Sequence, residues 1–305
     1  MKRIITLTCA IMMSLVANAQ ILYKISGKNL QKESYLLGTV HTVAASFVDS
    51  IPGANRVLGE VQQVCGELDM RYITNPDTSL AIALLMILPE DSTANKIMSE
   101  EYINELCLTV KENYNIDLST PQYATLLKLY PIMLMLTIPQ LSEIMKNQQK
   151  ATEGKNSATP PVVMDLYFQQ EAEKAGKTVI GFEYYTFQIK LLTSLLEMPM
   201  KEQYEKMLES FKNKREGENE IKCIEAVYKS FDLKQLGEEI NKDDDFANYA
   251  TKVFDSRNED WIIKMQPIMK EKSTLFVVGA GHIIGEKGLL KLLRQQGYDV
   301  TAVTK

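Results

Sequence analysis

Residues 274–282 read TLFVVGAGH, an apolar run followed by glycine and, three residues later, by histidine. A continuous run of β-branched and apolar residues predicts a strand that is buried on both faces, as in the centre of a sheet covered by helices. Residues 35–41 (YLLGTVH) have the same pattern, with Gly38 three residues before His41. The chain therefore has two predicted strands that lead into Gly-x-x-His, and these two motifs contain both of its histidines.

Strand and helix patterns alternate around these two runs. Further strands are predicted at residues 21–26, 64–68, 178–182 and 298–303. Helices are predicted at about 52–63, 162–175 and 288–296, and as two long blocks at about 78–150 and 186–270. This order predicts an α/β fold, with a central mixed sheet flanked by helices and with large helical insertions, as one domain over residues 20–305. The strand–loop–helix–strand order at the end predicts a compact βαβ unit.

The first nineteen residues have the pattern of a secretory signal peptide. Lys2 and Arg3 precede an apolar stretch, and Ala17-Asn18-Ala19 provides a small-x-small cleavage site before Gln20. A membrane anchor is the less favoured alternative, because the stretch is too short to span a bilayer. We therefore expect a periplasmic or secreted protein, cut near Ala19–Gln20, with no stable membrane span after cleavage.

The composition limits the kinds of partner that the protein is expected to bind. Of 305 residues, 45% are hydrophobic and 24% are charged, which is ordinary for a globular protein, and the net charge is −5. Binding to nucleic acid requires a clustered cationic face, and no stripe of Lys and Arg is apparent. We expect a peptide or small-molecule substrate and no nucleic acid; the oligomeric state stays open.

Histidines and carboxylates follow four of the predicted strands. His41 and His282 follow the two apolar runs, Glu67 ends the strand at 64–68, and Glu183 follows the strand at 178–182. Sites form at the carboxyl ends of strands in open α/β sheets, and glycines such as Gly38 and Gly279 let the backbone turn and approach a ligand. The alternatives are hydrogen-bonded core histidines and solvated strand ends.

This residue set suits a divalent metal. Two imidazoles with one or two carboxylates, here His41, His282 and Glu67, hold such an ion with an open position for water, and zinc is possible. The ion would lower the pKa of that water, and Glu183 would act as general base or fourth ligand. Asp69 is either a supporting partner or a plain turn residue.

Several motifs, in order, resemble the TraB/GumN/TIKI family. Residues 35–41 and 65–69 (CGELD) resemble its opening, and residues 176–183 (GKTVIGFE), followed by Gln188, are similar to its middle motif. Arg257-Asn258 with Trp261, and residues 276–288 (FVVGAGHIIGEKG), resemble its close. Phe182 and Thr178 depart from the leucine and proline usual at their positions.

The resemblance implies a divalent-metal hydrolase, with manganese or cobalt favoured and with animal members reported as proteases. It also implies a fold similar to the erythromycin-esterase and haem-binding ChaN group. In residue terms it points to His41, Glu67, Glu183, Arg257, Asn258 and His282.

Arg257 and Asn258 have two interpretations. In the first, both residues stabilise negative charge that develops in the reaction, because a guanidinium offers forked donors. In the second, Arg257 has a structural role and stacks on Trp261, four residues away. The favoured hypothesis is an exported metallohydrolase that cleaves an amide bond in a peptide. The alternatives are a non-catalytic binder of a peptide or haem in the same cleft, and an interaction protein built on the helical blocks.

Overall fold

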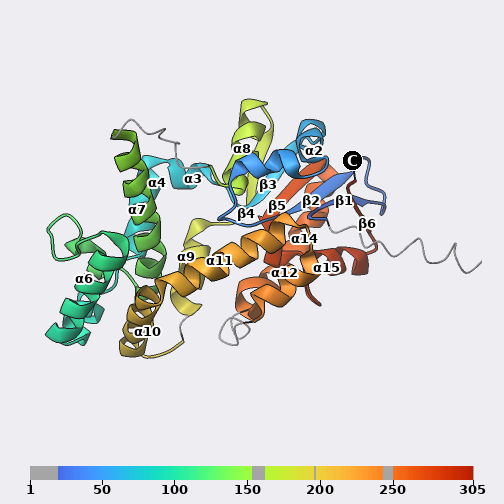
Figure 1. The fold of residues 1–305 in the computed structure, drawn as a ribbon. Coiled ribbons are helices and arrows are strands. Elements are labelled where there is room, and N and C mark those ends of the chain that lie inside the picture. Colours follow the sequence, from blue (N-terminus) through green and yellow to red (C-terminus); the bar gives the residue numbers. More distant parts are fainter. Residues whose placement is uncertain (1–19, 153–161, 196, 243–249, 305) are drawn as a thin grey trace, which may run out of the picture.

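The computed structural model describes residues 20–152, 162–195, 197–242 and 250–304 (Figure 1). The signal peptide expected at residues 1–19 lies outside them. One six-stranded mixed sheet organises the chain, in the order β4-β3-β5-β2-β1-β6. Its strands are β1 (Leu22–Ser26), β2 (Ser34–Thr39), β3 (Gln63–Leu68), β4 (Thr178–Glu183), β5 (Thr274–Gly279) and β6 (Asp299–Ala302). The α/β class and the mixed sheet flanked by helices are confirmed.

Four consecutive strands, β4, β3, β5 and β2, are parallel. β2 pairs with β5, β5 with β3, and β3 with β4, all in parallel, whereas β1 is antiparallel to both β2 and β6. The strand–helix–strand order expected at the end of the chain is present and its two strands are parallel, but the unit is not compact, because β2 and β1 lie between β5 and β6. The hairpin of β1 and β2 leaves one edge of β1 free, and the last strand pairs there.

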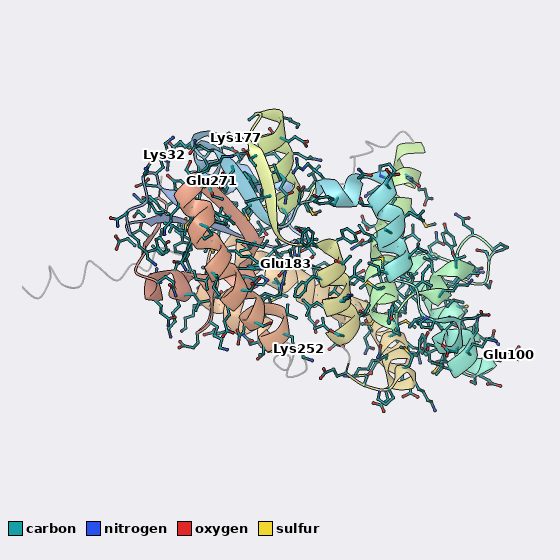
Figure 2. All side chains as sticks on the ribbon, turned by 180° about the vertical axis from the view of Figure 1, so that it is seen from behind. Lys32, Glu100, Lys177, Glu183, Lys252 and Glu271 are labelled. Carbon is teal, nitrogen blue, oxygen red and sulfur yellow. The ribbon has the colours of Figure 1, made fainter. Side chains whose placement is uncertain are left out.

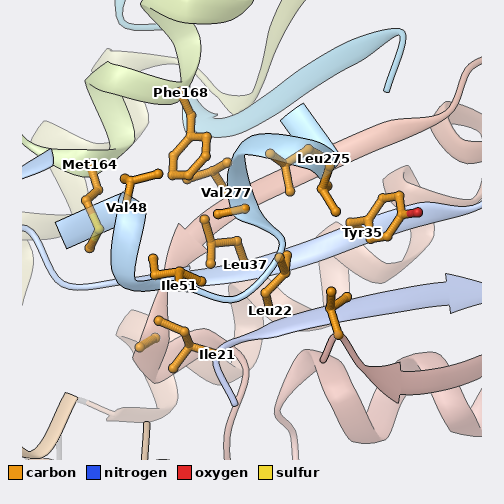
Figure 3. Packing of buried hydrophobic residues seen from close by; sticks show 14 of the residues in the cluster. Ile21, Leu22, Tyr35, Leu37, Val48, Ile51, Met164, Phe168, Leu275 and Val277 are labelled. Carbon is orange, nitrogen blue, oxygen red and sulfur yellow. The ribbon is translucent and has the colours of Figure 1, made fainter. Parts of the chain in front are cut away.

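Helices cover both faces of the sheet, so that the domain has three layers. On one face lie η2 (Ala45–Ser50), α2 (Ala54–Glu60) and α8 (Met164–Lys174), and Figure 3 shows Val48, Ile51, Met164 and Phe168 packed against Leu37, Leu275 and Val277. On the other face α14 (Ser256–Glu271) and α15 (Leu289–Gln295) pack on Leu36, Phe276 and Val278. Successive residues of β2 and β5 thus enter opposite cores, as the pleat requires.

Most of the remaining helices lie in the two long connections around β4. The first contains α3 (Arg71–Thr74), α4 (Pro76–Leu85), η3 (Glu90–Ser92), α5 (Ala94–Ile97), α6 (Glu100–Tyr114), η4 (Ala124–Lys128) and α7 (Pro131–Thr152). The second contains α9 (Tyr185–Leu195), α10 (Met200–Lys212), α11 (Lys214–Lys229), α12 (Leu233–Ile240) and the π-helical turn η5 (Thr251–Asp255). Helices α6, α7 and α10 share a third core, beside the sheet rather than on it (Figure 1). Within the described residues, no helix has the length and apolar character that crossing a membrane requires.

Candidate functional site

The parallel strands bring the four predicted side chains to one edge of the sheet. Glu183 at the end of β4 pairs in register with Leu68, and Thr39 of β2 pairs with Gly279 of β5. His41 and the short helix η6 (Ala280–His282) follow directly. Figure 2 shows Glu183 at the end of its strand, where side chains of α9 and α14 reach it.

His282 is buried and held from all sides. Its side chain is 2% exposed, and its ring lies 4.3 Å from the Trp261 ring and 4.9 Å from the Phe254 ring, centroid to centroid. Nδ1 lies 2.7 Å from Asn258 Oδ1, and Nε2 lies 2.9 Å from Arg257 Nη1. Burial lowers the pKa of His282 to about 3, against the attraction of Glu67, so the ring is neutral near pH 7.

These contacts decide the tautomer of His282. The guanidinium has only donors, so Nε2 accepts a hydrogen bond and the ring proton is on Nδ1, which donates to Asn258 Oδ1. Asn258 is oriented in turn, because its Nδ2 donates to the carbonyl oxygens of His282 and Lys287. Asn258 therefore fixes both the position and the tautomer of the ring.

His41 has an open environment by comparison. Its side chain is 69% exposed, and Nδ1 lies 3.0 Å from Asp165 Oδ2. The other oxygen of Asp165 accepts a 2.6 Å hydrogen bond from Thr39 Oγ1. The hydrogen bond to Asp165, followed by its charge, raises the pKa of His41 to about 9. Asp165 thus orients the ring and leaves Nε2 free of any partner among the described residues.

Arg257 is the centre of the buried network. Nε and Nη2 donate to Glu183, Nη2 donates to Glu67, and Nη1 donates to Val253 O and to His282 Nε2. All five guanidinium N–H groups are therefore used. The guanidinium also lies 4.6 Å from the centre of the Trp261 ring, so the stacking contact expected from the sequence is present. Stabilising a reacting oxygen would require Arg257 to give up one of these bonds.

The two glutamates differ in their remaining capacity to accept hydrogen bonds. Glu183 accepts two bonds at each oxygen, from Arg257 Nε and Trp261 Nε1 at Oε1, and from Arg257 Nη2 and Gln188 Nε2 at Oε2. Glu67 Oε2 is likewise filled, but among the described residues Oε1 accepts only the Gly279 N–H, and it lies 3.7 Å from His282 Nε2. Glu67 therefore keeps one lone pair toward His282, whereas Glu183 has none left.

Charge keeps Glu67 ionised. Burial alone would raise the pKa of this carboxyl, but His282, which is charged only at acidic pH, and the charges of Arg257 and His41, together with the Gly279 N–H, outweigh burial and lower the pKa to about 2. One guanidinium faces two carboxylates, so the buried network carries a net negative charge near pH 7. A further cationic or proton-donating group is the electrostatic complement of this pocket.

The motif glycines allow close approach between segments. A Cβ on Gly38 would lie 2.6 Å from Ile283 Cδ1 and 3.1 Å from Ala280 Cα, so the first motif packs directly on the second. A Cβ on Gly279 would lie 3.2 Å from Glu67 Oε1. The glycines thus let the second motif pack closely against both β2 and Glu67 of β3.

Several contributors were not evident from the residue pattern. Asp165 lies in the first turn of α8, 124 residues from His41, and no spacing connects the two. Gln188, noted only through the family resemblance, donates to both Glu67 and Glu183. Asp69 pairs with Arg71 instead of supporting the four strand-end residues.

The donor chemistry fits a divalent ion, although the described geometry does not assemble a complete ligand set. Both imidazoles hold Nδ1 against a protein oxygen, as metal-binding histidines do, so that Nε2 is the ring atom that could ligate, and Glu67 Oε1 has one lone pair left. In the described parts of the chain, no group of three or more His, Cys, Asp or Glu is close enough to hold an ion. Arg257 occupies the lone pair of His282 Nε2 in this arrangement.

Known proteins match this architecture in sequence. The family model of the TraB/PrgY/gumN family matches residues 21–302. The chain is 25% identical to "Metalloprotease TIKI2" of Xenopus tropicalis over 311 residues, which cover 88% of this chain and 57% of that protein. It is 25% identical to "Metalloprotease TIKI2" of Danio rerio (88% and 58%) and 23% identical to "Metalloprotease TIKI1" of Xenopus tropicalis (88% and 59%).

The match covers somewhat less than three fifths of each of these relatives, and no solved structure matches the chain. The match to the family model nevertheless spans all six strands and every residue of the network described above. The chain belongs to the TraB/PrgY/gumN family.

Proposed function

We propose that this protein is an exported hydrolase that uses a divalent metal ion to cleave an amide bond in a peptide. Its family membership and its similarity to proteins named metalloproteases support a protease-like activity. The fold similarity to the erythromycin-esterase and ChaN group, and export through residues 1–19, are parts of the same proposal.

The orientation of the two imidazoles carries the proposal. His41 and His282 both have Nδ1 against a protein oxygen, from Asp165 and Asn258, so that Nε2 is the ring atom that could bind an ion, although Nε2 of His282 would first have to release Arg257. An acceptor at one ring nitrogen fixes the tautomer and raises the basicity of the other nitrogen, which is what a metal ligand needs. Two independent supports of this kind, in a chain with two histidines, favour ligation over ordinary packing.

The residues divide into ligands and supports. His41, His282 and Glu67 would hold the ion, which when bound supplies a water of lowered pKa and a polarised carbonyl. Manganese or cobalt is expected from the family resemblance, and zinc suits the nitrogen and oxygen donors. Glu183, with all its lone pairs filled, holds Arg257 and Trp261 in place and has none left for an ion or a proton.

Metal binding and hydrolysis are tested together. Purified wild-type protein, His41→Ala and His282→Ala are titrated calorimetrically with Mn²⁺, Co²⁺ and Zn²⁺ after treatment with a chelator. Each is then incubated with a peptide pool that is analysed by mass spectrometry. We expect the wild type to bind one ion and to produce fragments, and each substitution to weaken binding by about 10- to 100-fold or more. A wild type that binds none of the three ions contradicts the proposal.

The guanidinium on His282 Nε2 favours a second candidate function. Because this bond occupies a ligating atom, the cleft is also consistent with a non-catalytic binder of a peptide or haem. Calorimetric binding of peptides, or a haem absorbance change, that survives both histidine substitutions without any cleavage would favour the binder.

A further inference from the structure

A shallow hollow of about 380 Å³ lies beside Glu183, at the outer end of the site. Its walls come from the end of β4, from the start of α9 and from one side of α14. The residues that line it are Phe182, Glu183, Tyr184, Phe187, Ser256, Arg257, Asp260 and Lys264. Two of these residues, Glu183 and Arg257, also belong to the buried network, so the hollow and the site share a wall.

The hollow offers aromatic surface to solvent. Tyr184 is 75% exposed and Phe187 is 47% exposed, while the Phe182 ring is buried between Trp261 and Phe276. Exposed aromatic side chains gathered at a concave surface next to polar groups are typical of ligand sites. They gain free energy when another apolar group covers them.

The polar groups in the walls already have partners. Arg257 and Glu183 are saturated, as described above, and Lys264 pairs with Asp260 and donates to Phe182 O. Ser256 Oγ donates to Lys252 O. A polar ligand group would therefore find few open donors or acceptors to replace its hydrogen bonds to water. An apolar group has no such hydrogen bonds to lose when it enters.

We propose that this hollow is the subsite that selects an aromatic or large aliphatic side chain of the substrate peptide, an inference that rests on the proposed function. Neighbouring strands lie ~4.8 Å apart, so the end of β4 is about 5 Å from the end of β3, which carries Glu67, and about 10 Å from the end of β5, which leads into His282. An extended peptide rises ~3.3 Å per residue. The selected side chain therefore lies about two or three residues from the bond that is cleaved.

The test uses binding, so that it does not depend on cleavage. Capped alanine heptapeptides, each with a single Phe at a different position, and matched peptides with Ser at that position, are titrated calorimetrically in the presence of a chelator. The proteins are the wild type, Phe187→Ala and Tyr184→Ser. Ile263→Ala is the matched control, because this apolar side chain on α14 is 66% exposed and does not line the hollow.

We expect the best Phe peptide to bind the wild type and Ile263→Ala about tenfold more tightly than its Ser counterpart. Phe187→Ala and Tyr184→Ser should each lose most of this preference. Equal binding of Phe and Ser peptides by the wild type, or a preference unchanged in both hollow variants, overturns the subsite. A Phe preference without cleavage under any metal contradicts only the hydrolase, and cleavage without a Phe preference contradicts only the subsite.

Discussion

The two Gly-x-x-His segments have the same residue pattern and opposite environments. His282 is enclosed by Trp261, Phe254 and the Arg257 guanidinium, and its pKa falls to about 3. His41 is mostly exposed, is held by Asp165 alone within the part of the chain that the structure describes, and has a pKa near 9. The motif determines where a histidine lies relative to its strand, but the surrounding helices determine its charge.

The difference assigns separate tasks to the two histidines. The buried ring is part of a network that also stabilises the fold, since Arg257 and Asn258 both depend on it. The exposed ring can be changed at little cost to the rest of the molecule. Substitutions on the two sides should therefore separate stability from function.

The largest effect is expected from Arg257→Ala on the buried side. Removing the guanidinium leaves Glu67 and Glu183 buried without their cation and takes a partner from His282. Breaking a buried ion pair by removing one partner costs about 3–5 kcal/mol. Urea unfolding followed by circular dichroism should show this loss as a lower midpoint.

Arg56→Ala is the control for Arg257→Ala. Arg56 pairs with Glu60 on the surface of α2, where both side chains are about half exposed. Exposed pairs of this kind contribute less than about 1 kcal/mol. Equal losses in the two variants would mean that the buried network does not stabilise the fold.

The next effect separates the two histidines directly. His282→Ala should lower the free energy of unfolding by about 2–4 kcal/mol, because it leaves a cavity under Trp261 and removes the acceptor of one Arg257 N–H group. His41→Ala should change the free energy by less than about 1 kcal/mol. Both are measured by urea unfolding of the metal-free protein, and a larger loss for His41→Ala would reverse the assignment of tasks.

The sequence was sufficient to predict the strands and to predict that the four candidate residues lie at the carboxyl ends of strands. Continuous apolar runs such as 274–278 identify central strands without knowledge of their partners, and parallel strands must end together. The partner of β6 was not predictable in the same way. Its pairing with β1 depends on which edge the β1–β2 hairpin leaves free, and no local pattern records that.

The supporting contacts at the site depend on distances that the sequence does not encode. Arg257 meets Glu67 across 190 positions of the chain, and Asp165 meets His41 across 124. The family resemblance pointed to Arg257, but only its five contacts indicate that it holds the network together. Asp165 had no signal beyond an acidic residue in a first helical turn, which the helix dipole explains equally well.

A smaller effect is expected from Gly38→Ala, which tests the contact between the two motifs. The new methyl group would meet the mobile end of Ile283 and, less easily displaced, the backbone at Ala280. Overpacking of this kind costs about 1–3 kcal/mol. Gly59→Ala in α2 has nothing within 4 Å and should gain up to about 1 kcal/mol, because alanine favours a helix. If both substitutions act alike in urea unfolding, the close approach at Gly38 is not a constraint.

The smallest change is a shift in the titration of His41. With Asp165→Asn, the charged partner is lost, and the pKa of His41 should fall from about 9 toward its ordinary value of 6.5. The chain has two histidines and His282 is neutral throughout the neutral range, so NMR of the metal-free protein should resolve one moving imidazole signal. Since the folded pKa is raised, the associated stability is present below about pH 6.5 and is lost as the pH rises through 9, and exposure of the ring keeps it small. An unchanged titration in Asp165→Asn would mean that Asp165 does not set the charge of His41, and the contrast between the two motifs would then need another cause.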